Sequence, residues 1–357
     1  MKILIVSDAW LPQINGVVRT LSTTKKVLES MGHEVKMITP DLFHTVPCPT
    51  YPEIQLVISP TGSKIQKEIE TFQPDCIHIS TEGPLGLSAR RICRKLNKIF
   101  TTSFHTKFPE YVHARFGVPI SWTYSLLRWF HGLSKRVMVA TASMRSELEG
   151  QGFNNLAYWS RGVDIDLFHP REYNIFADEK RPVAVYVGRV AVEKNIEAFL
   201  DMDFEGSKYV VGSGPQLEQL QQKYPDVHFV GSKSGEELAS YYASADVFVF
   251  PSKTDTFGLV LLEALASGTP VAAYPVPGPI DIIGKDSPVG CLDEDLATAA
   301  RNALKLDASQ CRQHALKYSW QSCTQQFVKN LAINKKISAP RVTIKRKPKP
   351  PMLKLES

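Results

Sequence analysis

The first half of the chain alternates short apolar runs with amphipathic stretches. The runs are four to six residues long and rich in Val and Ile, as expected for strands buried on both faces of a parallel sheet. They lie at residues 2–7, 34–39, 76–80, 100–104 and 137–140, with one more short strand near 156–161 and helical patterns at 17–30 and 85–97. Strands that alternate with helices predict a parallel sheet covered by helices.

A second alternation begins after a polar, turn-rich stretch at 170–181, which we interpret as a linker. Strand patterns lie at 183–187, 208–211, 227–230, 247–250 and 271–274, and helical patterns at 193–199, 216–223, 235–244, 259–266 and 295–304. The pattern therefore predicts an α/β protein with two Rossmann-like parallel-sheet domains, residues 1–170 and 171–334. Such domains bind ligands at the carboxyl ends of their strands.

Composition agrees with two domains of ordinary size. The chain has 357 residues, 43% hydrophobic and 22% charged, which excludes a disordered or fibrous protein as a whole. The formal charge of +6 is concentrated in residues 335–357, where eight Lys or Arg and one Glu give +7. This Pro- and Lys-rich tail predicts a disordered end. It has two readings, a solubilising end or an attraction to anionic lipid; nothing else in the chain favours nucleic acid.

Targeting and redox features favour a cytoplasmic protein. The six cysteines show no disulfide or metal spacing, which favours reduced thiols. The first apolar run is broken by Ser7 and Asp8, so it reads as a strand and not as a signal peptide. No run of about 20 apolar residues is present, so we expect no spanning helix.

The stretch from Phe250 to Val271 carries the strongest chemical signal. A strand ends at Phe250, a polar loop carries Asp255, and Gly258 opens a helix that bears Glu263. The first amides of that helix have no partner within it, so they can bind phosphate. The two carboxylates lie at opposite ends of this unit and suit two groups of hydroxyls on an elongated ligand. A capping Asp and a surface Glu are the alternative reading.

Further candidates follow other strands. Arg189 and Lys194 lie just beyond the strand at 183–187, where they could neutralise a diphosphate, although bases in a loop are usually solvated. Gly212 and Gly16 lie in glycine loops after strands, a weak signal when taken singly. His105 directly follows the strand at 100–104; a lone histidine is more often structural.

Taken in this order, the motifs resemble the retaining family-4 glycosyltransferases of GT-B architecture. The resemblance runs from Met1 to about Leu331 and rests on several short motifs. These are Asn15-Gly16-Val17, Phe104-His105-Thr106, Gly162-Val163-Asp164, Val187-Gly188-Arg189 with Lys194, Gly212-Ser213-Gly214-Pro215, and the residues from Asp255 to Pro270.

The resemblance implies a role for each motif. Arg189 and Lys194 hold the donor diphosphate, Glu263 the ribose, Asp255 the hydroxyls of the transferred sugar, and His105 the reacting face. Gly16, Gly212 and Gly231, with the loop and helix start at Thr256, Phe257, Gly258, Leu259 and Val260, complete the nucleotide-sugar site. The family has Glu at the position of Asp255, and this shorter side chain puts the reach to the sugar in question.

The implied chemistry is hexosyl transfer with retention. Departure of a nucleoside diphosphate leaves an oxocarbenium-like carbon, so fixed positive charge at the leaving group matters most. Arg189 and Lys194 supply that charge, so the prediction includes no metal and no cofactor beyond the donor substrate. No pair of carboxylates at glycosidase spacing can be identified.

The acceptor side suggests a lipid. A predicted helix carries Arg90, Arg91, Arg94 and Lys95, and aromatic residues interleave with cations in the segment that follows. The aromatic residues are Tyr111, Phe116, Trp122, Tyr124, Trp129 and Phe130, and the cations are Arg115, Arg128, Lys135 and Arg136. This pattern suits a lipid interface, although a core helix with snorkelling bases would look similar. Glu82-Gly83-Pro84-Leu85-Gly86 and Trp159-Ser160-Arg161 resemble the subgroup that glycosylates diacylglycerol or makes related mannosides. We therefore predict a UDP-sugar donor and a lipid acceptor at the inner membrane face.

Other classes fit less well. A GDP-mannose-dependent mannosyltransferase with a lipid or soluble acceptor stays open. A nucleotide-sugar epimerase would share the fold, but its acid/base set cannot be located. A non-catalytic sugar-binding protein would not need Arg189, Lys194, Asp255 and Glu263 together. An oxidoreductase is weaker still, since no Gly-x-Gly-x-x-Gly follows the first strand.

Overall fold

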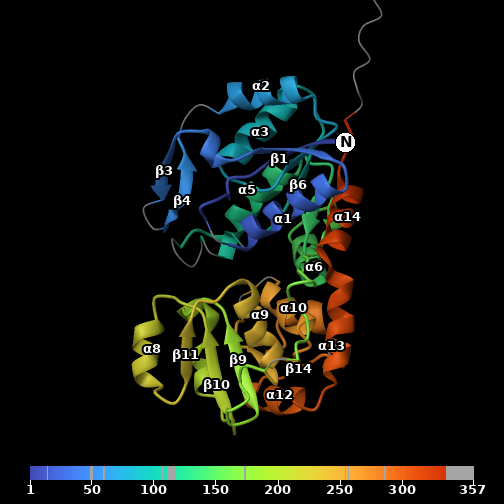
Figure 1. The fold of residues 1–357 in the computed structure, drawn as a ribbon. Coiled ribbons are helices and arrows are strands. Elements are labelled where there is room, and N and C mark those ends of the chain that lie inside the picture. Colours follow the sequence, from blue (N-terminus) through green and yellow to red (C-terminus); the bar gives the residue numbers. More distant parts are fainter. Residues whose placement is uncertain are drawn as a thin grey trace, which may run out of the picture.

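The computed structural model describes residues 1–13, 15–48, 51–58, 61–105, 108–110, 112, 117–172, 174–253, 255, 257–284 and 287–334, with the side chains of 48 and 51–54 left aside. Two lobes lie one above the other (Figure 1). Each contains a six-stranded parallel sheet with helices packed against it. The predicted α/β class with two parallel sheets is confirmed. The predicted tail, 335–357, and Thr256 lie outside the described residues.

The sheet of the first lobe has the order β2-β1-β5-β6-β7-β8. Its strands are β1 (Lys2–Val6), β2 (Glu34–Ile38), β5 (Cys76–Ile79), β6 (Thr101–Ser103), β7 (Val137–Val139) and β8 (Leu156–Tyr158). The connections run to opposite sides of β1, so a switch point lies between β1 and β5, the usual place for a ligand in such sheets. The loops after these two strands carry Asp8 and Glu82.

Helices on both faces bury this sheet. They are α1 (Gly16–Ser30), α2 (Gly62–Phe72), α3 (Pro84–Lys95), α5 (Ile120–His131) and α6 (Ala142–Gly150), with a short 3-10 turn η1 (Pro40–Leu42). An antiparallel hairpin of β3 (Thr45–Cys48) and β4 (Tyr51–Val57) stands beside the sheet. The hydrophobic pattern predicted neither the hairpin nor α2 and α6, and it gave no bounds for α5.

The sheet of the second lobe has the order β11-β10-β9-β12-β13-β14, with its switch point between β9 and β12. The strands are β9 (Val183–Val187), β10 (Ser207–Val211), β11 (His228–Gly231), β12 (Val247–Phe250), β13 (Val271–Ala273) and β14 (Gly290–Leu292). The helices are α7 (Glu197–Leu200), α8 (Leu217–Lys223), α9 (Gly235–Ser244), α10 (Leu259–Ala266), α11 (Pro277–Ile283), α12 (Leu296–Ala303) and α13 (Ala308–Ala315).

The helix predicted at 193–199 is wrong in one respect. It is broken at Asn195, whose φ of 52° is left-handed, into a 3-10 turn η2 (Val192–Lys194) and the short helix α7. Asn tolerates this conformation better than most residues. Its side-chain Nδ2 donates to the carbonyl of Pro251 at 3.0 Å. This hydrogen bond connects the loop after β9 to the loop after β12.

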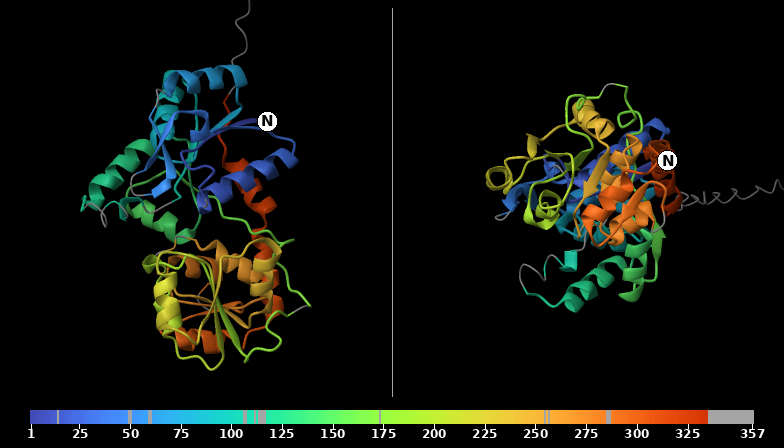
Figure 2. Two further views of the ribbon diagram at one scale, coloured as in Figure 1. Left: turned by 60° about the vertical axis from the view of Figure 1, so that its left-hand side comes forward. Right: turned by 90° about the horizontal axis from the view of Figure 1, so that it is seen from below.

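The last helix returns to the first lobe. After the 3-10 turn η3 (Leu316–Tyr318), α14 (Trp320–Asn330) packs beside α1, and the left view of Figure 2 shows it in red, reaching the first lobe. Phe327 is fully buried against Trp159 and His78 of the first lobe. The amide of Val163 donates to the carbonyl of Tyr318 at 2.8 Å. The two stretches of chain that pass between the lobes, near Val163 and near Tyr318, therefore lie side by side.

Contacts between the lobes join the carboxyl edges of the two sheets. Ser143, just after β7, donates through its amide and its hydroxyl to Asp281, each at 3.0 Å. Arg19 of α1 pairs with Glu263 of α10. We call the region between these edges the interdomain face. In the described part of the chain, no helix is long and apolar enough to cross a membrane, and Cys76, Cys93, Cys291, Cys311 and Cys323 are free thiols.

Candidate active site

The loop from β12 to α10 forms the centre of the predicted donor site. Gly258 caps α10 with a φ of 80°, a conformation that favours glycine. Among the described residues, nothing accepts a hydrogen bond from the amides of Gly258, Leu259 and Val260. Phe257 is buried beneath this turn. The arrangement leaves a row of backbone donors at the positive end of a helix, suited to an anion.

The structure brings Lys194 and Asp255 together. The Lys194 Nζ lies 2.6 Å from the Asp255 Oδ1, and both side chains are about one quarter exposed. The pair lies at the carboxyl edge of the sheet because η2 follows β9 and Asp255 follows β12, which are neighbouring strands. Two residues that the sequence assigned to one ligand are thus in direct contact.

Arg189 lies at the same edge of the sheet. Its side chain is half exposed and lies 3.9 Å from the Glu193 carboxylate, a weak surface pair. Its backbone is fixed, because the Tyr186 hydroxyl donates to the Arg189 carbonyl at 2.8 Å. The guanidinium therefore extends from a rigid turn and is available to a ligand.

The predicted glycines fall into two groups. A side chain at Gly212 would place its Cβ 1.9 Å from the carbonyl oxygen of Gly188, so this glycine is required by the close crossing of two loops. By contrast, a Cβ at Gly16 or Gly231 would meet nothing within 4 Å. The backbone is thus open at Gly16 and Gly231, whereas Gly212 has a structural requirement of its own.

Glu263 is a buried carboxylate shared by both lobes. Only 2% of the residue is exposed. The Tyr242 hydroxyl donates to its Oε2 at 3.0 Å, and the Arg19 Nη1 lies 2.5 Å from its Oε1. Burial, with the Glu263 charge, raises the pKa of Tyr242 well above its usual value, so the phenol stays a donor. Sequence reasoning missed Arg19, since the pairing depends on how the lobes meet.

His105 is held by a directed chain of hydrogen bonds. Arg161 can only donate, so its Nη2 donates to the His105 Nδ1 at 2.8 Å. The ring therefore carries its hydrogen on Nε2 and donates to the Ser103 hydroxyl at 2.8 Å. Ser103 then donates to the His78 Nε2 at 3.1 Å, and the His78 Nδ1 donates to Thr101 at 2.9 Å. Both ring nitrogens of His105 are thus occupied within the protein.

Arg161 anchors this chain as a buried cation. It is 7% exposed, and among the described residues no carboxylate pairs with it. It lies over the Trp159 ring at 4.9 Å and donates to the Trp159 carbonyl at 3.2 Å. Burial lowers its pKa to about 10, which still leaves it charged at neutral pH. Burial and then the Arg161 charge lower the pKa of His105 well below its usual range.

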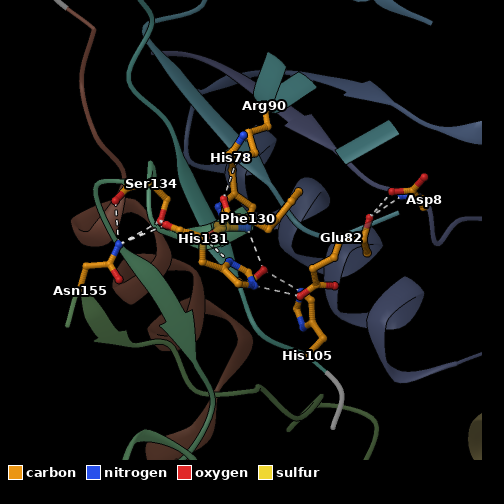
Figure 3. A network of polar contacts seen from close by, with 12 residues as sticks. Asp8, His78, Glu82, Arg90, His105, Phe130, His131, Ser134 and Asn155 are labelled. Carbon is orange, nitrogen blue, oxygen red and sulfur yellow. Dashed lines mark hydrogen bonds and ion pairs between the residues drawn. The ribbon is translucent and has the colours of Figure 1, made fainter. Parts of the chain in front are cut away.

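A second polar chain ends at Glu82 (Figure 3). The Ser134 hydroxyl donates to the His131 carbonyl at 2.7 Å, so Thr102 donates to Ser134 and the His131 Nδ1 donates to Thr102. The His131 Nε2 lies 3.2 Å from the Glu82 Oε1. With its hydrogen on Nδ1, a neutral His131 ring has an acceptor at Nε2, and an ionised Glu82 also only accepts. Because two acceptors cannot form a hydrogen bond, the contact between them requires one further proton. Glu82, about one quarter exposed, thus presents a supported carboxyl group at the switch point.

Asp8 lies at the same edge of the sheet, in the loop that follows β1. Its carboxylate accepts from the amides of Leu85 at 2.7 Å and Gly86 at 3.2 Å, at the amino end of α3, and from the Thr81 hydroxyl at 2.8 Å. Burial raises its pKa. Asp8 acts as a cap supplied from another element, which explains why no capping residue precedes α3 in the sequence.

Comparison with known proteins identifies the family. The model for "Glycosyltransferase Family 4" matches residues 14–167, and that for "Glycosyl transferases group 1" matches residues 181–306. The sulfoquinovosyl transferase of Arabidopsis thaliana is 31% identical, over 91% of this chain and 72% of its own length. The chain belongs to glycosyltransferase family 4. It is therefore a hexosyltransferase that uses a nucleotide sugar.

Other relatives of this glycosyltransferase differ in donor and acceptor. A GDP-mannose-dependent alpha-mannosyltransferase of Mycobacterium tuberculosis is 29% identical, over 90% of this chain and 93% of its own length. The alpha-monoglucosyldiacylglycerol synthase of Streptococcus pneumoniae is 28% identical, over 85% of this chain and 78% of its own length. The substrates in these names belong to those proteins.

Solved structures show the same fold. A sucrose-phosphate synthase from Thermosynechococcus elongatus has a TM-score of 0.72 at 23% identity, over 92% of this chain and 97% of that one. The Anabaena protein HepE in complex with UDP has a TM-score of 0.70 at 16% identity, over 92% and 99%. The predicted GT-B architecture is confirmed. Within the described ranges, no three His, Cys, Asp or Glu side chains are grouped as a metal site requires.

The neutral histidine chain predicts acid sensitivity. Burial lowers the pKa of His78 to about 3, whereas the unfolded chain titrates near 6.5, so the unfolded state binds the extra proton first. The contribution of this imidazole to the free energy of unfolding is therefore full above about pH 6.5. Below that pH it falls by about 1.4 kcal/mol per pH unit. Chemical denaturation at pH 6.5 and pH 5 measures this slope.

The variant His78→Gln provides the comparison. It lacks the imidazole, so its free energy of unfolding should fall less between the two pH values, even though its stability is lower throughout. The exposed variant His44→Gln is the matched control and should keep the wild-type slope. An unchanged slope in His78→Gln would contradict the assignment of a neutral, buried ring.

Proposed function

We propose that this glycosyltransferase moves a hexosyl group, with retention, from a nucleotide diphosphate sugar to a lipid acceptor at the cytoplasmic face of a membrane. A UDP-sugar is the favoured donor. The observation that carries the lipid acceptor is an exposed apolar stripe on α5. A GDP-mannose donor is the second candidate, supported by the mannosyltransferases among the relatives.

The donor diphosphate binds where backbone donors and cations converge. The amides of Gly258, Leu259 and Val260, which have no acceptor among the described residues, face the same edge as Lys194 and Arg189. Charged donors that are fixed before the reaction stabilise a departing diphosphate without reorganisation. Glu263 binds the ribose hydroxyls, and Gly231 lies where the base is framed.

Asp255 links the diphosphate to the transferred sugar. Its Oδ1 lies 2.6 Å from the Lys194 Nζ. In the donor complex, Lys194 bridges Asp255 and the β-phosphate, and the second Asp255 oxygen accepts from a sugar hydroxyl. This arrangement gives a role to the residue that replaces the family's glutamate.

The reaction proceeds on one face of the sugar. The bond from the anomeric carbon to the phosphate oxygen breaks, the acceptor oxygen bonds to that carbon, and the acceptor proton passes to the departing phosphate. His105 offers no free ring nitrogen, because Arg161 and Ser103 occupy both. We therefore assign His105 to shaping the sugar pocket and not to proton transfer.

The stripe on α5 consists of apolar side chains at successive helical turns. Trp122 is 72% exposed, Leu126 56% and Trp129 54%, and Leu133 follows just beyond the helix. Positions four and three residues apart share one face of a helix. The opposite face, with Tyr124 and Phe130, is buried. An exposed apolar stripe that contains two Trp side chains suits the headgroup region of a bilayer.

Three of the cations predicted for the lipid surface are engaged within the protein. Arg128 donates to the Gln151 carbonyl at 2.7 Å and Arg136 to the Asn330 carbonyl at 3.0 Å, and Arg90 is the third. Arg91, Arg94 and Lys95 are exposed on α3. Arg90, however, is 7% exposed and donates to the carbonyls of Trp129 and Phe130 at 2.7 and 2.9 Å. Its guanidinium also lies 3.8 Å from the centre of the Trp129 ring. Arg90 therefore fixes the end of α5, and the exposed cations, Arg91, Arg94, Lys95 and Lys135, would meet anionic lipid. Tyr111, Phe116 and Arg115 lie outside the described residues.

Removal of the Lys194 charge tests the donor site. We expect Lys194→Ala to lower transfer from the preferred donor by about 100-fold or more, because a charge on the leaving group is lost. The fold should survive, since the Lys194–Asp255 pair is partly exposed. A radiolabelled donor assay, after a panel of UDP- and GDP-sugars has identified the donor by thermal stabilisation, measures the loss. Lys223→Ala, a surface pair in the same domain, is the control; near wild-type turnover in Lys194→Ala would refute the assignment.

Vesicle binding tests the lipid surface. We expect the double variant Trp122→Ser/Trp129→Ser to lose sedimentation with anionic vesicles, while transfer to a short-chain, water-soluble acceptor continues. Leu316→Ser, at another exposed apolar position, should bind vesicles like the wild type. Deletion of residues 335–357 separates the contribution of the tail. If wild-type protein does not sediment with vesicles, the membrane-bound acceptor is wrong.

A further inference from the structure

The Arg19–Glu263 ion pair joins the two lobes at the place where the proposed donor would bind. Arg19 comes from the first turns of α1, and Glu263 from the second turn of α10, on opposite sides of the interdomain face (Figure 1). The carboxylate is buried, and a buried carboxylate needs partners for both oxygens. Tyr242 satisfies one and Arg19 the other.

The two partners of Glu263 differ in their freedom to move. Tyr242 is completely buried beside Phe168 and Phe248, so its hydroxyl is fixed. The Arg19 side chain is 44% exposed. A long side chain that is partly in water can change rotamer at little cost. Arg19 is therefore the partner that a ligand can displace.

Binding of a ribose at Glu263 requires such a displacement. A ribose diol donates hydrogen bonds, but the Glu263 Oε1 that pairs with Arg19 is buried, so the diol reaches this oxygen only when the guanidinium moves away. An arginine cannot lose its charge, so the displaced guanidinium needs another anion. A nucleoside diphosphate brings one with it.

The distance between the two anions is short. Leu259, whose amide is free for phosphate among the described residues, lies four residues before Glu263 on α10. Side chains four apart lie about 5–6 Å from each other on one face of a helix. The Arg19 guanidinium thus needs to move by about one helical turn, from the carboxylate toward the amino end of α10.

We infer that Arg19 is a ligand of the donor diphosphate, held on Glu263 until the ribose displaces it. This inference rests on the proposed function. It makes Arg19 a contact of the first lobe to the donor, beside the open backbone at Gly16. The exchange couples recognition of the ribose to recognition of the diphosphate. A nucleoside that lacks the diphosphate would break the ion pair and leave the Arg19 guanidinium without an anion.

Affinities for a nucleoside and its diphosphate test the exchange. For uridine and UDP, or guanosine and GDP if that base is preferred, the wild type should favour the diphosphate strongly. In Arg19→Gln this preference should shrink by about 10- to 100-fold, as expected for loss of a hydrogen bond to a charged group. Diphosphate binding weakens, while nucleoside binding holds or improves. Arg19→Lys should lie between the two, because it keeps the charge but loses the fork of donors. Isothermal titration measures the diphosphate, and competition against it measures the nucleoside.

The outcomes separate this inference from the proposed function. Lys25→Gln, on the same helix and paired with Glu29 within it, is the control and should keep the wild-type preference. An unchanged preference in Arg19→Gln, including an equal loss for both ligands, would show that Arg19 does not reach the diphosphate. If the wild type itself bound neither UDP nor GDP, the proposed donor site would fail first.

Discussion

A buried carboxylate, Glu263, is the constraint on which the interdomain face depends. Its oxygens are satisfied from both lobes, by Tyr242 of its own domain and by Arg19 of the other. Removal of one partner from a buried charge costs more than the pair contributes, so the pair favours this arrangement of the two lobes. The same carboxylate lies one turn from the helix start that suits phosphate, so this contact between the lobes also lies within the proposed donor site.

In the first lobe, one buried cation fixes the direction of a chain of hydrogen bonds. Arg161 can only donate, and this single fact orders the chain through His105, Ser103 and His78. A parallel chain through Ser134 and Thr102 leaves one proton between His131 and Glu82. The sheet edge facing the second lobe therefore presents Glu82 as a partly exposed carboxyl group, while His78, His105 and His131 are committed to internal contacts.

Much of the architecture follows from the sequence because each signal is local. Val183–Val187 and Val247–Phe250 are apolar runs of strand length, and Gly258 opens α10 as predicted. The break at Asn195 was not predictable from the helical pattern, because it depends on the Pro251 carbonyl of a distant loop. The hairpin of β3 and β4 was missed since prolines interrupt both strands.

The site was predictable only in part for the same reason. Lys194, Arg189 and Asp255 follow neighbouring strands, and parallel topology brings such residues to one edge. Arg161 lies in one motif of the resemblance and Arg19 directly follows another, but neither had a predicted role, because their importance arises from contacts with Glu263 and His105 far away in the chain. Gly212 was recognised as a turn glycine, but the reason for it is the Gly188 carbonyl oxygen, which would lie 1.9 Å from any added Cβ. That close approach of two loops depends on tertiary packing, which the local sequence does not report.

The most direct test of the account is an experimental structure with a bound nucleoside diphosphate. The account predicts the diphosphate at the amides of Gly258 to Val260 with Lys194, the ribose on Glu263, and the Arg19 guanidinium moved from the carboxylate to a phosphate oxygen. A nucleotide bound elsewhere, or bound in this place with the Arg19–Glu263 pair intact, would contradict it.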